Sequence, residues 1–387
     1  MSIKTNKYEI NGYTPLQYAE LFIDRHMVRI PAKEFSFTYV GAEGNFTYQQ
    51  GIVLRGIQEI YKRDGKKEYK KYITDWLECV TYENGVPQGD EKGWKSRESL
   101  DYRQPGSLFF DLYKETGDEK YLNGLDYLFE DIKNFKKTSH GLFFHNISGS
   151  RNHQVLVDGL FMASPSSVKY AVLRDDKELL DIAMDQPVIM WENMRDEATG
   201  LLRHAWDESK QAKWADKETG LSHFVWSRAI GWYAAGITEI YEAAPKDHKN
   251  IPKIRKIIKE LFTNVVKYQT KNGRWYQIID KGDDPRNWID NSGTFLILYA
   301  MAKAIKNGVL DESFVENVMR GYTDAIVNST VITEDGFNIL DICEGTVVGE
   351  IVEYYYYRRR VVNEEHGVGG FLLMCAEIDA MLEMIDG

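Results

Sequence analysis

Apolar residues recur through most of the chain with the period of an α-helix. Val53, Ile57 and Ile60 fall on one helical face, as do Leu108 and Leu112 further along. Polar turns such as RDGKKEY, TGDEKY and RDDKEL alternate with glycine-led segments such as HGLFFHN and TGLLRHAWD, at a spacing of roughly 55 to 70 residues. This pattern predicts one helix after each glycine-led segment, over residues 51–63, 103–115, 158–173, 225–242, 290–307 and 368–384.

Six such helices, each paired with a second helix across a polar turn, predict a closed ring. One amphipathic hairpin cannot bury its apolar face alone, so repeated hairpins pack side by side. Residues 228–237 and 291–302 are rich in small and aromatic side chains, as a crowded inner ring requires. We therefore expect an all-α fold, an (α/α)6 barrel or six-hairpin toroid, with residues 1–387 as a single domain. The loops that lead into the inner helices would then line a funnel that holds the chemistry.

Composition limits the partners of such a ring. The 48 Lys and Arg residues are outnumbered by 59 Asp and Glu residues, for a net charge of −11. Nucleic acids and anionic membranes bind preferentially to basic surfaces, so neither is expected as a partner of this acidic chain. Three cysteines lie far apart at Cys79, Cys343 and Cys375, without metal or disulfide spacing, which favours a reducing compartment. The N-terminal residues lack the apolar core of a secretory signal, so we expect a cytoplasmic protein. It is expected to be a monomer or a homodimer.

One stretch of the chain is unusually rich in tryptophan. Flat aromatic faces beside a guanidinium suit a sugar ring that carries a carboxylate, because the rings stack on its C–H faces and the guanidinium pairs with the acid. Any one of these tryptophans could equally belong to the core. Taken together they predict a sugar-binding site; the residues are Trp206, Trp214, Trp226 and Trp232, with Arg228 between the last two and His204 just upstream.

Two aspartates stand where inner helices are expected to begin. Asp101 precedes Pro105, and an N-cap role explains it as well as catalysis does. Asp158 lies in the apolar run HQVLVDGLFMA. Burial there would raise the pKa of its carboxyl and keep it protonated, as a general acid requires. We therefore expect Asp158 to be catalytic.

Two histidines occupy equivalent places in consecutive repeats. His145 in LFFHN and His204 in LLRHAWD both follow a glycine-led segment, so they are expected to face the same funnel. Tyr48 enters the first inner helix and could form an aromatic wall of the site or belong to the core.

These motifs resemble glycoside hydrolase family 105, the unsaturated rhamnogalacturonyl hydrolases. The resemblance runs from about Tyr48 to the C-terminus and rests on the order of six motifs: YQQGIVLRGIQEIY, LDYRQPGSLFFDLY, QVLVDGLFMA, GLLRHAWDES, WADKETGLSHFVWSRAIGWY, and CEGTVVGE with EEHGVGGFLL. It implies an (α/α)6 barrel and a substrate that ends in a 4,5-unsaturated uronic acid.

The resemblance also implies roles for individual residues. Asp158 matches the general acid/base, which protonates C4 of the double bond before water adds at C5. Asp101 matches a second aspartate that orients the ring hydroxyls. The substrate-binding positions are matched by Tyr48, His145, His204, Trp226, Arg228 and Trp232. That Arg228 pairs with the substrate carboxylate is inferred from its charge alone.

The chain departs from the family pattern beside the expected site. Asn146 follows His145 where a lysine is usual, Leu156 replaces a tryptophan, and the loop between them is about two residues longer. The second sugar could sit there, so the alternatives to galacturonyl-rhamnose are an unsaturated glucuronyl substrate, as in the related family 88, and another pectic or ulvan-type fragment.

Two other classes of protein fit the same ring. A sugar 2-epimerase would use His145 and His204 as its acid and base, and a non-catalytic sugar-binding toroid would keep the tryptophans. The uronyl hydrolase is preferred because it alone accounts for Asp158. It needs no metal or cofactor, so activity should survive a chelator.

Overall fold

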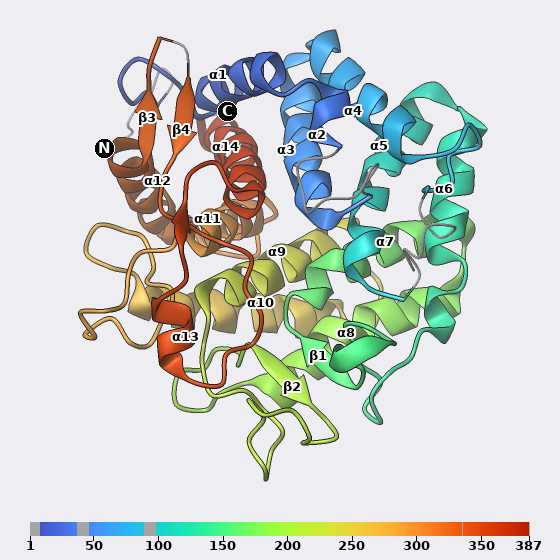
Figure 1. The fold of residues 1–387 in the computed structure, drawn as a ribbon, viewed down its shortest axis with the longest axis vertical. Coiled ribbons are helices and arrows are strands. Elements are labelled where there is room, and N and C mark those ends of the chain that lie inside the picture. Colours follow the sequence, from blue (N-terminus) through green and yellow to red (C-terminus); the bar gives the residue numbers. More distant parts are fainter. Residues whose placement is uncertain (1–7, 37–45, 89–97, 335, 387) are drawn as a thin grey trace.

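The helices form a closed ring around a central axis in the computed structural model, which describes residues 8–36, 46–88, 98–334 and 336–386 (Figure 1). Six helices line the inside of the ring: α3 (Tyr48–Asp64), α5 (Ser107–Thr116), α7 (Gly159–Arg174), α9 (Ser227–Ala243), α11 (Asn291–Lys306) and α14 (Glu365–Asp386). Six others surround them: α1 (Pro15–Arg29), α4 (Lys67–Val80), α6 (Glu119–Phe129), α8 (Lys177–Met194), α10 (Ile251–Val265) and α12 (Val315–Ser329). The predicted (α/α)6 barrel is confirmed.

The ring closes between the two ends of the chain. Helix α14 packs between α11 and α3, and its outer neighbour is α1 rather than a helix that follows it in sequence. Thr14 caps α1, because its hydroxyl accepts the N–H of Gln17 while the Gln17 side chain accepts the N–H of Thr14. One hairpin of the six is therefore assembled from both ends of the chain. That residues 1–387 form one domain stays a prediction, since residues 1–7 and the other gaps lie outside the described part.

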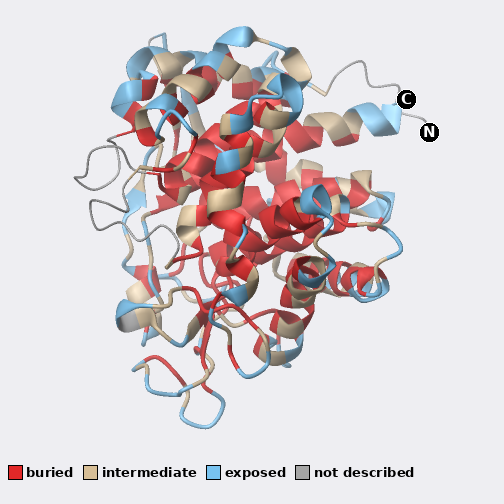
Figure 2. Cartoon of the chain, turned by 90° about the vertical axis from the view of Figure 1, so that its right-hand side faces the viewer, coloured by how far each residue is buried: buried red, intermediate tan, exposed pale blue. Residues whose placement is uncertain are grey.

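Helices α9 and α11 are buried along nearly their whole length, and buried residues, drawn red, fill the centre of the molecule in Figure 2. Glycines permit two of the closest approaches. A Cβ atom on Gly56 of α3 would lie 2.5 Å from Cβ of Leu372, and one on Gly369 of α14 would lie 2.6 Å from a side-chain carbon of Ile52. Helices α3 and α14 thus meet at a distance that any larger residue would increase.

Short strands and turns connect the helices. The two-stranded antiparallel sheets are β1 (Gln154–Leu156) with β2 (Ala205–Asp207), β3 (Thr330–Ile332) with β4 (Phe337–Ile339), and β5 (Ile342–Cys343) with β6 (Arg360–Val361). Two short helices, α2 (Ala32–Phe35) and α13 (Val352–Tyr356), complete the labelled elements. The 3-10 helices are η2 (Asp101–Gly106), η3 (Ile132–Asn134), η4 (Gly149–Arg151), η5 (Val266–Tyr268) and η6 (Glu312–Phe314). The helix predicted over 103–115 therefore begins as a 3-10 turn through Pro105 and continues as α5.

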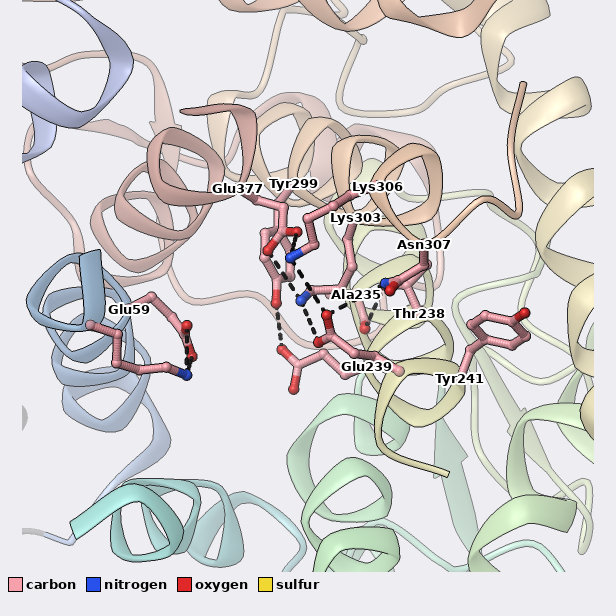
Figure 3. A network of polar contacts seen from close by, with 12 residues as sticks. Glu59, Ala235, Thr238, Glu239, Tyr241, Tyr299, Lys303, Lys306, Asn307 and Glu377 are labelled. Atoms are coloured by element: carbon pink, nitrogen blue, oxygen red, sulfur yellow. Dashed lines mark hydrogen bonds and ion pairs between the residues drawn. The ribbon is translucent and has the colours of Figure 1, made fainter. Parts of the chain in front are cut away.

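A network of buried charges joins the later halves of the inner helices (Figure 3). Glu239 accepts hydrogen bonds from Arg55 at 3.3 Å and from the Tyr299 hydroxyl at 2.8 Å. Lys303 pairs with Glu242 at 2.6 Å and with Glu377 at 3.1 Å. Each charge has an opposite partner, which is what makes burial of such groups tolerable. The network occupies the ring interior away from the starts of the inner helices, where the candidate site lies. None of the helices in the described part of the chain is long and apolar enough to cross a membrane.

Candidate active site

The two predicted aspartates lie at the entrances of two neighbouring inner helices. Asp101 is the first residue of η2, which runs into α5, and Asp158 is the N-cap residue of α7. The side chain of Asp158 makes no capping hydrogen bond. Its position at a helix start is therefore not explained by capping, the alternative that the sequence leaves open for such an aspartate.

Asp101 lies against one of the predicted histidines. Its carboxylate lies 3.1 Å from Nε2 of His145, whose ring is buried. Burial alone would raise the pKa of Asp101, but His145 outweighs it, with help from Arg151 and His366, so the pKa is lowered. Asp101 is therefore the ionised member of the two aspartates.

Asp158 has the opposite character. Burial raises the pKa of its carboxyl, and the neighbouring charges of His145 and Arg228 only partly oppose this. Its Oδ2 atom is buried without a hydrogen-bond partner among the described residues and lies 3.6 Å from Nε2 of His204, which is also unpaired there. Buried polar atoms are almost always paired, so two unpaired atoms that face each other indicate a place for a ligand or water.

His204 is fixed and uncharged. Its backbone carbonyl accepts the N–H of Val157 at 3.1 Å, so it is fastened to the strand that leads to Asp158. Its Nδ1 lies 2.8 Å from the hydroxyl of Tyr355. Burial and the positive charge of Arg228 lower the pKa of His204 to about 3, so the ring stays neutral. Asp158 thus faces an imidazole that adds no charge.

The tryptophans and arginine of the WSRAIGW motif pack inward in this structure. Trp226 is the N-cap residue of α9 and lies 4.6 Å from the His204 ring, centroid to centroid. Its indole N–H has no hydrogen-bond partner within the described ranges. Trp232 is 1% exposed and packs on Phe161 at 4.9 Å. Trp226 therefore lies beside His204, the histidine that faces Asp158. Trp232 instead packs against Phe161 of α7.

Arg228 makes three hydrogen bonds within the protein. Its guanidinium donates to the carbonyl oxygens of Cys343 at 2.5 Å and Glu344 at 3.0 Å, and to the Ser292 hydroxyl at 3.3 Å. It also lies over the Trp226 ring, 4.5 Å from the centroid. These contacts fasten β5 to the start of α9. Arg228 thus connects β5 with α9, and its pairing with a substrate carboxylate stays a prediction.

Tyr48 belongs to a chain of three hydrogen-bonded side chains. Its hydroxyl lies 2.7 Å from Nε2 of His366, and Nδ1 of His366 lies 2.5 Å from a carboxylate oxygen of Glu364. Burial would raise the pKa of Glu364, but His366 outweighs it and lowers that pKa. The ionised Glu364 orients the imidazole, which in turn positions the Tyr48 hydroxyl.

Three residues of this arrangement were not picked out as site residues in the sequence: Tyr355, Glu364 and His366. The last two lie in EEHGVGG, which is one of the motifs shared with family 105, so their presence could have been anticipated. Tyr355 lies in EYYYYRRR, where four adjacent tyrosines give no indication of which one turns inward. Among the described residues, no three His, Cys, Asp or Glu side chains are grouped as a metal site would require.

A proton donor and an ionised carboxylate at the mouth of a helical ring define a candidate acid–base site of the type that glycosidases use. The family model for Glycosyl Hydrolase Family 88 matches residues 18–382. The chain belongs to this family.

Solved structures support the same assignment. A glycoside hydrolase from family 105 of C. acetobutylicum ATCC 824 is 31% identical, with a TM-score of 0.86 over 94% of this chain and 99% of that chain. The predicted resemblance to family 105 is thereby confirmed. An unsaturated glucuronyl hydrolase specific for heparin shares the fold at 12% identity, with a TM-score of 0.70 over 95% of this chain and 98% of that chain.

Among curated proteins, Protein Atu3128 of Agrobacterium fabrum (strain C58 / ATCC 33970) is 28% identical over 149 residues, or 38% of this chain. That match spans 63% of the length of the relative.

Proposed function

We propose that the protein removes a 4,5-unsaturated uronic acid from the end of short oligosaccharides that a polysaccharide lyase has produced. The observation that carries this proposal is Asp158, a buried carboxyl with a raised pKa that faces a neutral histidine. Hydration of a vinyl ether begins with protonation of carbon, and a carboxyl whose pKa is raised by burial is suited to that step.

The proposed reaction has three steps. The Asp158 carboxyl donates its proton to C4 of the double bond, and the electron pair of that bond forms the new C–H bond. Water then adds at C5 and returns a proton to the Asp158 carboxylate. The resulting hemiketal opens, and the bond to the neighbouring sugar breaks, which releases that sugar in saturated form.

The other side chains position the ring in this proposal. Asp101, held as a carboxylate by His145, accepts hydrogen bonds from the ring hydroxyls. Trp226 and the Tyr48 hydroxyl provide an aromatic face and a polar contact beside it. We further propose that the enzyme works in the cytoplasm on imported disaccharides.

Unsaturated galacturonyl-rhamnose is the proposed substrate, in keeping with the family 105 resemblance. An unsaturated glucuronyl substrate is the second candidate, because one structural neighbour is an unsaturated glucuronyl hydrolase. Both candidates share the same double bond and carboxylate, so they differ only in the neighbouring sugar and not in the chemistry assigned to Asp158.

The test follows the ultraviolet absorbance of the conjugated enol acid as the protein acts on lyase-generated disaccharides from rhamnogalacturonan and from glycosaminoglycans. We expect decay with the rhamnogalacturonan fragment and a loss of about 10²- to 10⁴-fold in Asp158→Asn. Decay with glycosaminoglycan fragments alone would show that the substrate is unsaturated glucuronyl rather than galacturonyl-rhamnose, and it would leave the proposed mechanism unchanged. A folded protein that consumes none of the fragments would contradict the proposal and favour the epimerase or the binding toroid.

A further inference from the structure

The loop of residues 146–153 is tied at both ends to the segments that carry the two aspartates. At its start, the N–H of Ile147 donates to the carbonyl of Glu98 at 2.9 Å, three residues before Asp101. At its end, the carbonyl of Gln154, the first residue of β1, accepts the N–H of His145 at 2.7 Å. Strand β1 then leads to Asp158. The loop is therefore held next to both carboxyl groups, and its middle is the 3-10 turn η4, Gly149–Arg151.

Arg151, the last residue of that turn, carries a charge that pairs with none of the residues in 8–36, 46–88, 98–334 and 336–386. Its side chain is half-buried, and within these ranges it makes no hydrogen bond or ion pair. Its guanidinium nevertheless lies close enough to two site residues to act on them. After burial and His145, it helps to lower the pKa of Asp101, and after burial and Arg228, it helps to lower the pKa of His204. Arg151 thus lies within electrostatic range of Asp101 and His204.

Arg228, the other arginine of the site, is less available to an anionic ligand. Arg228 is 1% exposed, and three of its five N–H donors are used by the carbonyls of Cys343 and Glu344 and by the Ser292 hydroxyl. A carboxylate that paired with either of the two terminal nitrogens would compete with these bonds. An anionic ligand therefore needs a cation that is near the aspartates and still has free donors, and Arg151 meets both conditions.

We propose that Arg151 binds the carboxylate of the unsaturated uronate and thereby makes the enzyme prefer an acidic sugar ring to a neutral one. This inference rests on the proposed function and deepens it. A guanidinium presents a planar pair of N–H donors that matches a carboxylate, so one residue both neutralises the anion and orients the ring. The carboxylate is attached to C5, next to the carbon that Asp158 protonates. Arg151 is accordingly a substrate-binding residue that determines specificity.

The experiment compares each unsaturated disaccharide with its methyl ester, which keeps the double bond but lacks the negative charge. We expect Arg151→Gln to raise KM for the acid about 10- to 100-fold and to leave KM for the ester nearly unchanged. Arg151→Lys should recover part of the loss, because it restores the charge without the planar pair of donors. Arg195→Gln removes an equal charge from an outer helix, where Arg195 pairs with Glu260 at 3.5 Å, and should change neither KM. An unchanged KM for the acid in Arg151→Gln, or an equal loss for acid and ester, would overturn the proposal.

A second measurement separates this inference from the reaction itself. D-galacturonate, which has no double bond to hydrate, is titrated by calorimetry into Asp158→Asn and into Asp158→Asn with Arg151→Gln. We expect binding to the first protein and a loss of about 10-fold or more in the second. If no unsaturated substrate is consumed but this difference is seen, the proposed reaction fails and the anion site stands. If substrate is consumed and binding of D-galacturonate is absent or does not depend on Arg151, the reaction stands and the anion site is wrong. Thermal unfolding of Arg151→Gln should be close to that of the wild type, because the side chain has no hydrogen bond or ion pair to lose among the described residues.

Discussion

The hydroxyl of Tyr355 lies 2.8 Å from Nδ1 of His204 and accepts the backbone N–H of Gly349 at 3.0 Å. The phenol has a single proton, and Nδ1 is its nearest described acceptor, so Tyr355 donates to His204. The remaining ring proton of the neutral imidazole is then on Nε2, the atom that faces Asp158 at 3.6 Å. Tyr355 thereby sets the tautomer of His204, the histidine beside the proposed acid Asp158.

We expect Tyr355→Phe to lower kcat roughly 10-fold, because either nitrogen of His204 can then carry the proton. The imidazole ¹⁵N resonances should change from a single Nε2–H tautomer to a mixture. Tyr354→Phe is the matched control, since the neighbouring hydroxyl accepts only the N–H of Val347, at 3.2 Å. An unchanged tautomer in Tyr355→Phe would show that the phenol does not set it.

The pH–activity profile should fall on the alkaline side because of Asp158 and on the acid side because of Asp101. Asp158 must be protonated to act as an acid, and burial raises its pKa, so kcat/KM should fall as the pH rises through that value. Asp101 must be ionised, and His145 keeps its pKa low, so activity should fall on the acid side only well below neutrality. His204, with a pKa of about 3, adds no limb near neutral pH. A profile that rises steadily from pH 5 to 9 would contradict the assignment of Asp158 as the acid.

The same carboxyl should destabilise the folded protein at neutral pH. Because the pKa of Asp158 is higher in the folded state than in the unfolded state, its contribution to stability is complete below the ordinary carboxyl pKa of about 3.9 and is lost as pH rises through the folded value. Asp158→Asn stays neutral, so we expect its Tm to exceed that of the wild type by about 1–3 °C at pH 8 and to approach it near pH 4. Calorimetry at several pH values measures this. A lower Tm for the variant at pH 8 would count against a strained, desolvated carboxyl.

The ring and the two aspartates could be predicted from the sequence because each leaves a local mark. Helical periodicity repeats with every hairpin, and Asp158 stands alone in an apolar run. The contacts of Arg228 could not be predicted in this way, since its acceptors at Cys343 and Glu344 are more than 100 residues away and are backbone carbonyls, which every residue possesses. The burial of Trp232 against Phe161 depends likewise on how α7 and α9 are rotated relative to each other, which periodicity does not fix.

The buried network should be sensitive to the loss of one charge. Lys303→Met removes a buried cation that pairs with Glu242 and Glu377, whereas Lys306 still pairs with both, so we expect a loss of about 1–3 kcal/mol in the free energy of unfolding. Lys71→Met breaks an exposed pair with Asp75 and should cost at most about 1 kcal/mol. Urea unfolding of both variants measures the contrast, and equal losses would mean that the network contributes no more than a surface pair.

The glycine contacts between α3 and α14 offer a test of ring closure. A methyl group in Gly56→Ala would lie 2.5 Å from Cβ of Leu372, so the two helices must separate, and we expect a loss of about 1–3 kcal/mol. Gly282→Ala is the control, because its methyl group would meet only the edge of the Tyr276 ring at 3.2 Å. Thermal unfolding compares the two variants. A stable Gly56→Ala would show that the ring adjusts its diameter without cost.

The pairing of α1 with α14 also determines when the ring can form during synthesis. Helix α3 leaves the ribosome about 300 residues before its neighbour α14, which corresponds to roughly 15–60 s of translation. During that interval the faces of α3, α11 and α1 that α14 later covers are open to water and to other chains. A nascent chain of this protein therefore exposes the apolar surface that α14 covers in the folded ring. We expect it to bind chaperones until α14, the last inner helix, has been made.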